Sequence, residues 1–281
     1  MRKPKHVKIN ENVIIGNDLP FTLIGGPCPL ESRDHALFMA KSLVKITNEL
    51  NIPYVFKTSY DKANRSSGHS KRGIGLEKAL DIFKEIKDCF GCPILTDVHT
   101  EEQCEPVSTV VDIMQIPAFL CRQTDLVMAI ARMGKTVNIK KGQFLSPWEI
   151  SNIIDKIEEV GNHRILLTER GVSFGYNTLI IDPRSIPIMA KTGYPTVIDA
   201  THAVQQPGGL GETTGGDKEM APIIARSAVS NGVGAVFIET HNDPDNAPSD
   251  GPNMIHLDKM YDLLKILQEF DNIAKKNPVN I

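Results

Sequence analysis

The sequence predicts a (β/α)8 barrel, or TIM barrel, with a short N-terminal β-hairpin, in one domain that spans residues 1–281 and has residues 1–16 as the hairpin extension. Eight short, mostly apolar segments read as buried strands, and each is followed by a segment with helical signals. Polar side chains capable of chemistry gather where these strands end. The competing fold, a doubly wound open sheet, usually has fewer strands and a GxGxxG motif after its first strand, which this sequence lacks there.

The elements follow in order along the chain. The turn-prone tripeptide Asn10-Glu11-Asn12 is flanked by Val7-Lys8-Ile9 and Val13-Ile14-Ile15, which predicts the hairpin. The predicted strands are residues 21–24, 54–57, 93–97, 111–115, 136–140, 164–168, 196–199 and 234–239. The predicted helices lie near residues 32–50, 76–89, from 100 onward, 123–133, from 146 onward, 183–191, 218–231 and 257–273.

Two of these helices carry explicit start signals. Thr100 and Gln103 form a capping-box pattern. Ser146, Pro147 and Glu149 supply an N-cap, a first-turn proline and a capping acid. The stretch between the sixth strand and its helix is expected to be long and irregular.

The composition indicates an ordinary soluble globular protein, with 41% hydrophobic and 23% charged residues. A net charge of −3 gives no global basic field for nucleic acid or an anionic membrane. No apolar run approaches the roughly 18–20 residues that span a bilayer, and the basic start lacks the apolar segment of a signal peptide. Five scattered cysteines favour a reducing cytoplasm over a disulfide framework. A cytoplasmic protein is therefore expected.

The polar side chains that follow the strands are the candidate site. They are Cys28, Lys57, Asp97, His99, Gln115, Lys140, Glu169, Arg170, His202, Glu239 and Asp250. In a closed barrel these positions face one mouth. Random placement would also put such residues on helices and at strand starts, so the set is stronger evidence than any single member.

One group within this set suits a metal ion. Cys28, His202, Glu239 and Asp250 offer a thiolate, an imidazole and two carboxylates, which fit a borderline divalent ion such as Fe(II), Zn(II) or Mn(II). Taken singly, each has a structural explanation. Cys28 suits a small buried apolar site, His202 a hydrogen-bonded structural histidine, and Asp250 a turn before Gly251.

A second group is cationic and consists of Lys57, Lys62, Lys140 and Arg170. A strand-end lysine can also extend its ammonium to solvent. Four cations aimed at one mouth would repel each other unless an anion compensates, which favours a phosphorylated substrate. The basic loop of residues 57–73 adds hydroxyl donors suited to phosphate, although a solvated basic loop is the alternative.

Three further features carry less weight. Cys89 and Cys92 form a C-x-x-C without a second pair, which favours packing over zinc or redox chemistry. The glycine-rich residues 206–216 suit either a phosphate cradle or a mobile lid. Arg122 is either an exposed cation or a phosphate ligand.

Several longer motifs resemble the 3-deoxy-D-manno-octulosonate 8-phosphate synthase family. They are KANRSS (62–67), TDVH (96–99), QIPAFLCRQTD (115–125), NIKKGQF (138–144), DATH (199–202) and FIETH (237–241). The likeness runs from about residue 17 to the last helix. It implies a homotetramer that condenses phosphoenolpyruvate with D-arabinose 5-phosphate and water. The products are the eight-carbon sugar acid phosphate, which feeds the inner core of lipopolysaccharide, and inorganic phosphate.

The resemblance also implies roles for individual residues. The implied catalytic residues are Lys57, Lys62, Asp97, Lys140 and His202. The implied ligands of phosphoenolpyruvate are Lys57, Lys62, Gln115, Lys140 and Arg170, and those of the pentose phosphate are Asn64, Arg65 and Ser66. The other implied substrate-binding residues are Ser59, Phe119 and Arg122. Arg122 would reach the sugar phosphate from a neighbouring subunit. The position of Cys28 is Asn in the branch of the family that works without metal. With His202, Glu239 and Asp250 also present, the chain resembles the metal-requiring branch.

Three other functions would also suit parts of this residue pattern. The related synthase that uses erythrose 4-phosphate would share the barrel, the metal set and the enol site, but it resembles Lys-Pro-Arg-Thr-Ser where this chain has residues 63–67, and Asn64 favours the longer sugar. A Schiff-base aldolase would use Lys57 or Lys140 as its nucleophile. A non-catalytic phosphate-binding barrel would not need the metal set.

Overall fold

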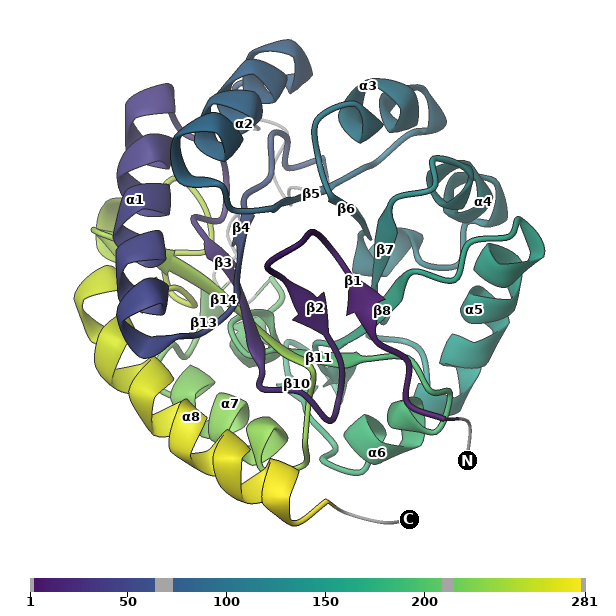
Figure 1. Cartoon of the computed structure of the whole chain (residues 1–281). Coiled ribbons are helices and arrows are strands. Elements are labelled where there is room, and N and C mark those ends of the chain that lie inside the picture. Colours follow the sequence, from purple (N-terminus) through teal and green to yellow (C-terminus); the bar gives the residue numbers. More distant parts are fainter. Residues whose placement is uncertain (1–2, 64–72, 209–214, 279–281) are drawn as a thin grey trace.

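The computed structural model of the chain describes residues 3–63, 73–208 and 215–278. Eight parallel strands close into a barrel in sequence order, because β14 pairs with both β3 and β11 (Figure 1). These strands are β3 (Thr22–Gly26), β4 (Tyr54–Lys57), β5 (Ile94–Asp97), β6 (Ile113–Ile116), β7 (Thr136–Lys140), β8 (Ile165–Glu169), β11 (Thr196–Asp199) and β14 (Ala235–His241). The predicted (β/α)8 barrel is confirmed.

The α-helices form a ring around the barrel (Figure 1). They are α1 (Arg33–Leu50), α2 (Leu76–Phe90), α3 (Cys104–Ser108), α4 (Thr124–Arg132), α5 (Ile150–Glu159), α6 (Ser185–Ala190), α7 (Ala221–Val229) and α8 (Met260–Lys276). Their apolar faces pack on the outward side chains of the strands in one large core. None of the described helices is long and apolar enough to span a bilayer.

Both predicted start signals are present, but each opens a short 3-10 turn before the α-helix. The Thr100 and Gln103 capping box precedes the turn Glu101–Gln103 and the five-residue α3. The Ser146 and Glu149 capping box precedes the turn Pro147–Glu149 and α5. The helix expected from residue 100 onward is therefore short, and α3 ends at Ser108.

The connection between β8 and α6 is more regular than predicted. It contains an antiparallel hairpin, β9 (Val172–Ser173) and β10 (Leu179–Ile180). Gly175 and Asn177 turn the chain with φ of 69° and 56°, which suits the two residue types that accept positive φ most readily. In the glycine-rich segment, β12 (Gln205–Gln206) pairs with β13 (Gly215–Gly216), while residues 209–214 lie outside the described part.

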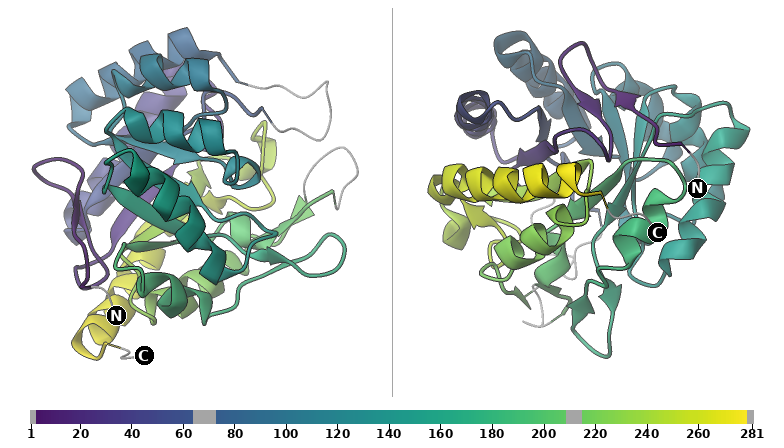
Figure 2. Two further views of the ribbon diagram at one scale, coloured as in Figure 1. Left: turned by 90° about the vertical axis from the view of Figure 1, so that its right-hand side faces the viewer. Right: turned by 60° about the horizontal axis from the view of Figure 1, so that its bottom comes forward.

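The N-terminal hairpin is also confirmed, as β1 (Val7–Lys8) and β2 (Ile14–Ile15). It lies across the centre of the barrel in Figure 1 and at the end opposite the long loops in Figure 2. The hairpin buries four apolar side chains, Val7, Ile9, Val13 and Ile15. They pack against the inward side chains Ile24, Val55, Leu95, Ile113, Leu166, Val197, Ala235 and Phe237. The hairpin thus closes the amino end of the barrel with an apolar plug.

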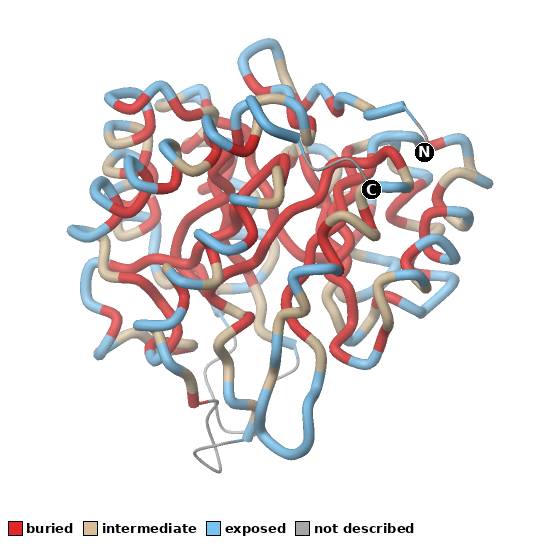
Figure 3. Tube along the Cα trace, turned by 90° about the horizontal axis from the view of Figure 1, so that it is seen from below, coloured by how far each residue is buried: buried red, intermediate tan, exposed pale blue. Residues whose placement is uncertain are grey.

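Buried residues are concentrated along the strands, between the hairpin at one end and exposed loops at the other (Figure 3). A short strand, β15 (Ile255–His256), extends the sheet beside β14 at the loop end. Because the amino end is plugged, the inside of the barrel is reached from the end where the strands finish.

Candidate active site

Along most strands, the side chains inside the barrel change from apolar beside the hairpin to polar two residues further on. Side chains two residues apart in a strand point to the same face, so each apolar plug contact is followed two residues later by another inward side chain. Those residues are polar on most strands: Lys57, Asp97, Gln115, Thr168, Asp199 and Glu239. All are buried, which requires partners for their polar groups.

One side of this polar layer is a hydrogen-bonded chain of neutral groups. The Asn138 amide donates to Gln115 Oε1 at 2.9 Å, and Thr168 Oγ1 donates to Asn138 Oδ1 at 2.6 Å. The three residues lie on adjacent strands β6, β7 and β8. This chain orients the Gln115 side chain at the mouth of the barrel.

Lys57 and Asp97 belong to a charged network on the other side. Lys57 Nζ lies 2.7 Å from Glu239 Oε1 and 3.2 Å from Ser59 Oγ. Ser59 in turn donates to Asp97, and His99 Nε2 lies 2.8 Å from the second oxygen of Asp97. Burial alone would raise the pKa of Asp97, but the hydrogen bond and charge of His99 hold it well below its usual range. Asp97 is therefore an ionised acceptor.

Lys140 forms a second buried pair, with Asp199. Its ammonium also lies 3.4 Å from the centroid of the Phe237 ring. Burial lowers the pKa of Lys140 to about 8, against the attraction of Asp199. Asp199 also accepts the backbone N–H of His202 at 2.9 Å, and its Oδ2 lies 2.7 Å from His202 Nδ1. One carboxylate therefore positions both a lysine and a histidine of the site.

The proposed metal ligands meet beside these pairs. One ligand atom each of Cys28, Glu239 and Asp250 lies within 4.8 Å of the other two. His202 Nε2 lies 3.7 Å from Glu239 Oε1. The Cys28 thiol donates to Asp250 Oδ2 at 2.9 Å, and its pKa is raised well above the usual value by burial and by the charges of Asp250 and Glu239. Asp250 adopts a φ of 53°, a costly backbone conformation for a non-glycine residue.

This donor set fits a divalent cation. The Cys28 thiol and the Glu239 carboxylate are buried and the Asp250 carboxylate is partly buried beside them, so a cation would compensate their charge and replace the thiol proton. His202 presents Nε2 on this side while Asp199 contacts Nδ1, which is the outer carboxylate contact that metal-binding histidines commonly have.

A polar bridge links Arg170 to Asp250, one of the proposed metal ligands. Arg170 Nη2 donates to Gln205 Oε1, and Gln205 Nε2 donates to Asp250 Oδ1 at 3.0 Å. The second guanidinium nitrogen, Nη1, is buried, and within the described residues it has no hydrogen-bond partner. Burial lowers the pKa of Arg170, against the attraction of the surrounding carboxylates. Arg170 thus retains, inside the site, a donor that no described residue uses.

A cavity of about 780 Å³ opens above this layer. Most residues predicted for the site line it, namely Lys57, Ser59, Lys62, Asp97, Gln115, Phe119, Lys140, Arg170, His202 and Asp250. Arg122 is exposed and is not among the described residues that line this cavity. Asn64, Arg65 and Ser66 lie outside the described residues, so the predicted pentose site stays a prediction.

Two of the four cations predicted to need an anion already have carboxylate partners. Lys57 and Lys140 are already compensated by Glu239 and Asp199, because barrel closure places these carboxylates beside them. Sequence reasoning assigned no role to Asp199 or to Gln205. Asp199 ends a predicted strand as the other site residues do, which is a usable signal. Gln205 lies in a loop and carries no such signal.

Fold and site together define the class of protein: a (β/α)8-barrel enzyme with a buried polar site at the carboxyl ends of its strands. The chain belongs to the DAHP synthetase I family, whose sequence pattern matches residues 5–276. It is 60% identical over 269 residues to the 2-dehydro-3-deoxyphosphooctonate aldolase of Brucella anthropi. The aligned residues cover 96% of this chain and 97% of that protein. It is 55% identical over 276 residues to the Bartonella quintana protein of the same name, covering 98% and 99%. The resemblance drawn from the motifs is confirmed.

Proposed function

We propose that this enzyme condenses phosphoenolpyruvate with D-arabinose 5-phosphate and water. The products are 3-deoxy-D-manno-octulosonate 8-phosphate, a precursor of the lipopolysaccharide inner core, and inorganic phosphate. The relatives named 2-dehydro-3-deoxyphosphooctonate aldolase support this function. The proposal rests most directly on one observation: a buried Arg170 donor that no described residue uses lies in a cavity that two buried lysines also line.

The cationic side of the cavity is proposed to hold the enol phosphate. A buried donor without a partner costs about 1–3 kcal/mol, and an anion placed against Arg170 Nη1 would remove that cost. Lys57, Lys62 and Lys140 then hold the phosphate and carboxylate of phosphoenolpyruvate, and Gln115 adds a neutral contact. Fixed cations of this kind orient the enol and stabilise charge that develops during the reaction.

Proton transfer is proposed to involve Lys140. A pKa of about 8 allows its amine to hold or release a proton near neutral pH, as general acid–base catalysis requires. Asp97 stays ionised and accepts hydrogen bonds from Ser59 and His99, so it offers a fixed negative charge to the reacting sugar. The enol C3 attacks the sugar aldehyde and water adds at C2, after which the C2–O bond to phosphate breaks.

A divalent metal ion, Fe, Zn or Mn, is proposed as the cofactor. Cys28, His202, Glu239 and Asp250 would hold it, and when bound it would supply Lewis acidity toward the aldehyde or toward water. Chelator treatment followed by metal add-back tests this assignment. We expect chelation and Cys28→Ala each to abolish turnover, and undiminished turnover in chelator would contradict the assignment.

The assembly is proposed to be a cytoplasmic homotetramer. Large apolar side chains on the loops near the mouth support an interface there: Phe119, Phe144, Trp148, Phe174 and Tyr176 are exposed. Exposed Arg122, in the neighbouring loop, is then placed to reach the sugar phosphate of an adjacent subunit. Light scattering tests the tetramer, and a monomer would contradict it.

Phosphate release tests the proposed reaction directly. The enzyme is mixed with phosphoenolpyruvate alone and then with D-arabinose 5-phosphate added, and phosphate is measured over time. We expect release only when the aldose is present. A protein that binds phosphoenolpyruvate but releases no phosphate would be a non-catalytic barrel, and a borohydride-trapped lysine adduct would indicate a Schiff-base aldolase instead.

A further inference from the structure

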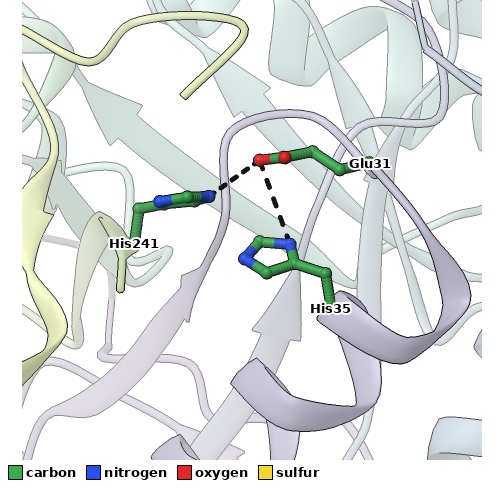
Figure 4. Close-up of side chains that lie close together, drawn as sticks. All are labelled: Glu31, His35 and His241. Carbon is green, nitrogen blue, oxygen red and sulfur yellow. Dashed lines mark hydrogen bonds and ion pairs between the residues drawn. The ribbon is translucent and has the colours of Figure 1, made fainter. Parts of the chain in front are cut away.

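Three polar side chains outside the cavity connect the segments that carry two of the proposed metal ligands. Glu31 follows Cys28 by three residues in the connection between β3 and α1, and His241 follows Glu239 by two residues at the end of β14. His35 lies in the first turn of α1. Figure 4 shows Glu31 between the two histidines, with dashed lines to both.

The contact between Glu31 and His241 has a fixed direction. The backbone N–H of Asp243 donates to His241 Nδ1 at 2.9 Å, so Nδ1 carries a lone pair and the proton of the neutral ring is on Nε2. His241 Nε2 lies 2.8 Å from Glu31 Oε1 and therefore donates to it. The His241 side chain is 6% exposed, which limits competition from water.

A second bond runs parallel to the first. His35 Nε2 lies 2.9 Å from Asn242 Oδ1, and the His35 and His241 rings lie against each other with centroids 4.6 Å apart and planes tilted by 44°. The start of α1 is thus joined twice to the end of β14, although the joined residues are more than 200 positions apart in the chain.

The opposite side of the Cys28 segment is held by the backbone. Ser59 N–H donates to Cys28 O at 3.2 Å, and Leu30 N–H donates to Ser59 O at 2.8 Å. These bonds fix the segment to the end of β4. The β3–β14 ladder pairs Gly26 with Glu239, and beyond this last pair the contacts of Glu31 and His35 join the segment to His241 and Asn242.

The trio also has the composition of a metal-binding group, but its hydrogen bonds do not suit one. A metal-bound histidine normally donates its other ring N–H to an acceptor. His241 does the reverse, because Nδ1 accepts from a backbone amide and Nε2 keeps its proton. His35 Nδ1 is buried, lies 3.9 Å from Glu31 Oε1 and has no hydrogen-bond partner within the described residues.

We infer that Glu31 and His241 are positioning residues that hold Cys28 and Glu239 at the spacing a divalent cation requires. The inference rests on the proposed metal site. Groups that orient metal ligands typically change metal affinity by 10- to 100-fold when they are lost. Because Glu31 and His241 act through the backbone of the ligand segments, we expect a loss of about tenfold, the lower end of that range.

Cobalt titration of the metal-free protein tests the inference. Co(II) binding is followed by the thiolate–cobalt absorption that Cys28 would give, and affinity is measured by competition with a chelator. Glu31→Ala and His241→Ala are each expected to weaken Co(II) binding about tenfold. Glu31→Gln, which keeps an amide oxygen as acceptor, is expected to restore most of the affinity. The double variant is expected to be no weaker than either single variant.

The matched control is His6→Ala. It removes another histidine–carboxylate contact of 2.8 Å, between His6 and Asp18 at the hairpin end of the barrel, and should leave Co(II) affinity unchanged. Wild-type Co(II) affinity in both Glu31→Ala and His241→Ala would overturn the positioning role of Glu31 and His241 while leaving the metal site intact. A second Co(II) per chain that is lost in His35→Ala would also overturn it, because the trio would then be a ligand set. A wild-type protein that shows no Cys28-dependent absorption would instead refute the metal site on which the inference rests.

Discussion

Replacing Asp199 with asparagine tests the electrostatic design of the site. Asp199 is fully buried and contacts both Lys140 and His202 Nδ1. Asparagine keeps the shape and an oxygen acceptor but removes the charge. The variant therefore leaves the Lys140 ammonium buried without its counterion.

The magnitude follows from the pKa of Lys140. Its shift from 10.5 to about 8 corresponds to about 3 kcal/mol, which is the cost of keeping the ammonium charged even with Asp199 present. Removing one partner of a buried ion pair costs about 3–5 kcal/mol, so Asp199→Asn should lose that much stability at pH 6. Because the folded pKa of Lys140 is below the unfolded one, the unfolded chain binds more protons between these two values, and this group's contribution to stability rises with pH across that window. In Asp199→Asn the pKa of Lys140 in the folded state falls further, so the rise of stability with pH begins at a lower pH. The difference in stability between the wild type and the variant therefore narrows toward pH 9.

Urea denaturation of four proteins measures this effect. They are the wild type, Asp199→Asn, Lys140→Met and the double variant, each at pH 6 and pH 9. We expect the double variant to be more stable than the sum of the single changes by at least about 2 kcal/mol, because it leaves no unpaired buried ammonium. The reasoning would be refuted if the losses of unfolding free energy in the single variants added up within about 0.5 kcal/mol. It would also be refuted if the stability lost in Asp199→Asn grew with pH.

Three other predictions concern the close approach of Gly26 to the Lys57 backbone, the hairpin plug and the proposed anion site. Gly26→Ala would place a Cβ about 2.0 Å from the carbonyl oxygen of Lys57, so we expect a loss of at least about 2 kcal/mol in urea denaturation, and wild-type stability would contradict this close approach. Ile15→Ala should cost about 2–5 kcal/mol because the side chain is fully buried in the plug, whereas Ile14→Ala, at an exposed neighbour, should stay within about 0.5 kcal/mol; equal effects would contradict the plug. Arg170→Lys keeps the charge but loses the second donor, so the KM for phosphoenolpyruvate should rise at least about tenfold in the phosphate-release assay, and an unchanged KM would remove Arg170 from the anion site.

The barrel could be predicted because its signals are local. Each strand is a short apolar run followed by a helix with its own start signals, and these repeat along the chain. The site could be located because polar residues such as Lys57 and Asp97 end those strands, and the barrel brings strand ends together. The hairpin was visible from its turn, but its role as a plug depends on how it packs.

The remaining features depend on geometry that one sequence does not carry. The β9–β10 hairpin has two-residue strands, which are too short for alternation to be recognised. The pairing of Lys140 with Asp199 joins residues on β7 and β11, which are brought together only by the curvature of the closed barrel. Gln205 gains its place between Arg170 and Asp250 from a loop path that has no periodic signal.

A competition between two aldoses tests the central claim most directly. The metal-loaded enzyme is given phosphoenolpyruvate with equal amounts of D-arabinose 5-phosphate and erythrose 4-phosphate, and the products are identified by mass spectrometry. The account predicts an eight-carbon keto acid phosphate as the dominant product. A seven-carbon product in excess would contradict the substrate assignment, and the absence of both products would contradict the proposed reaction.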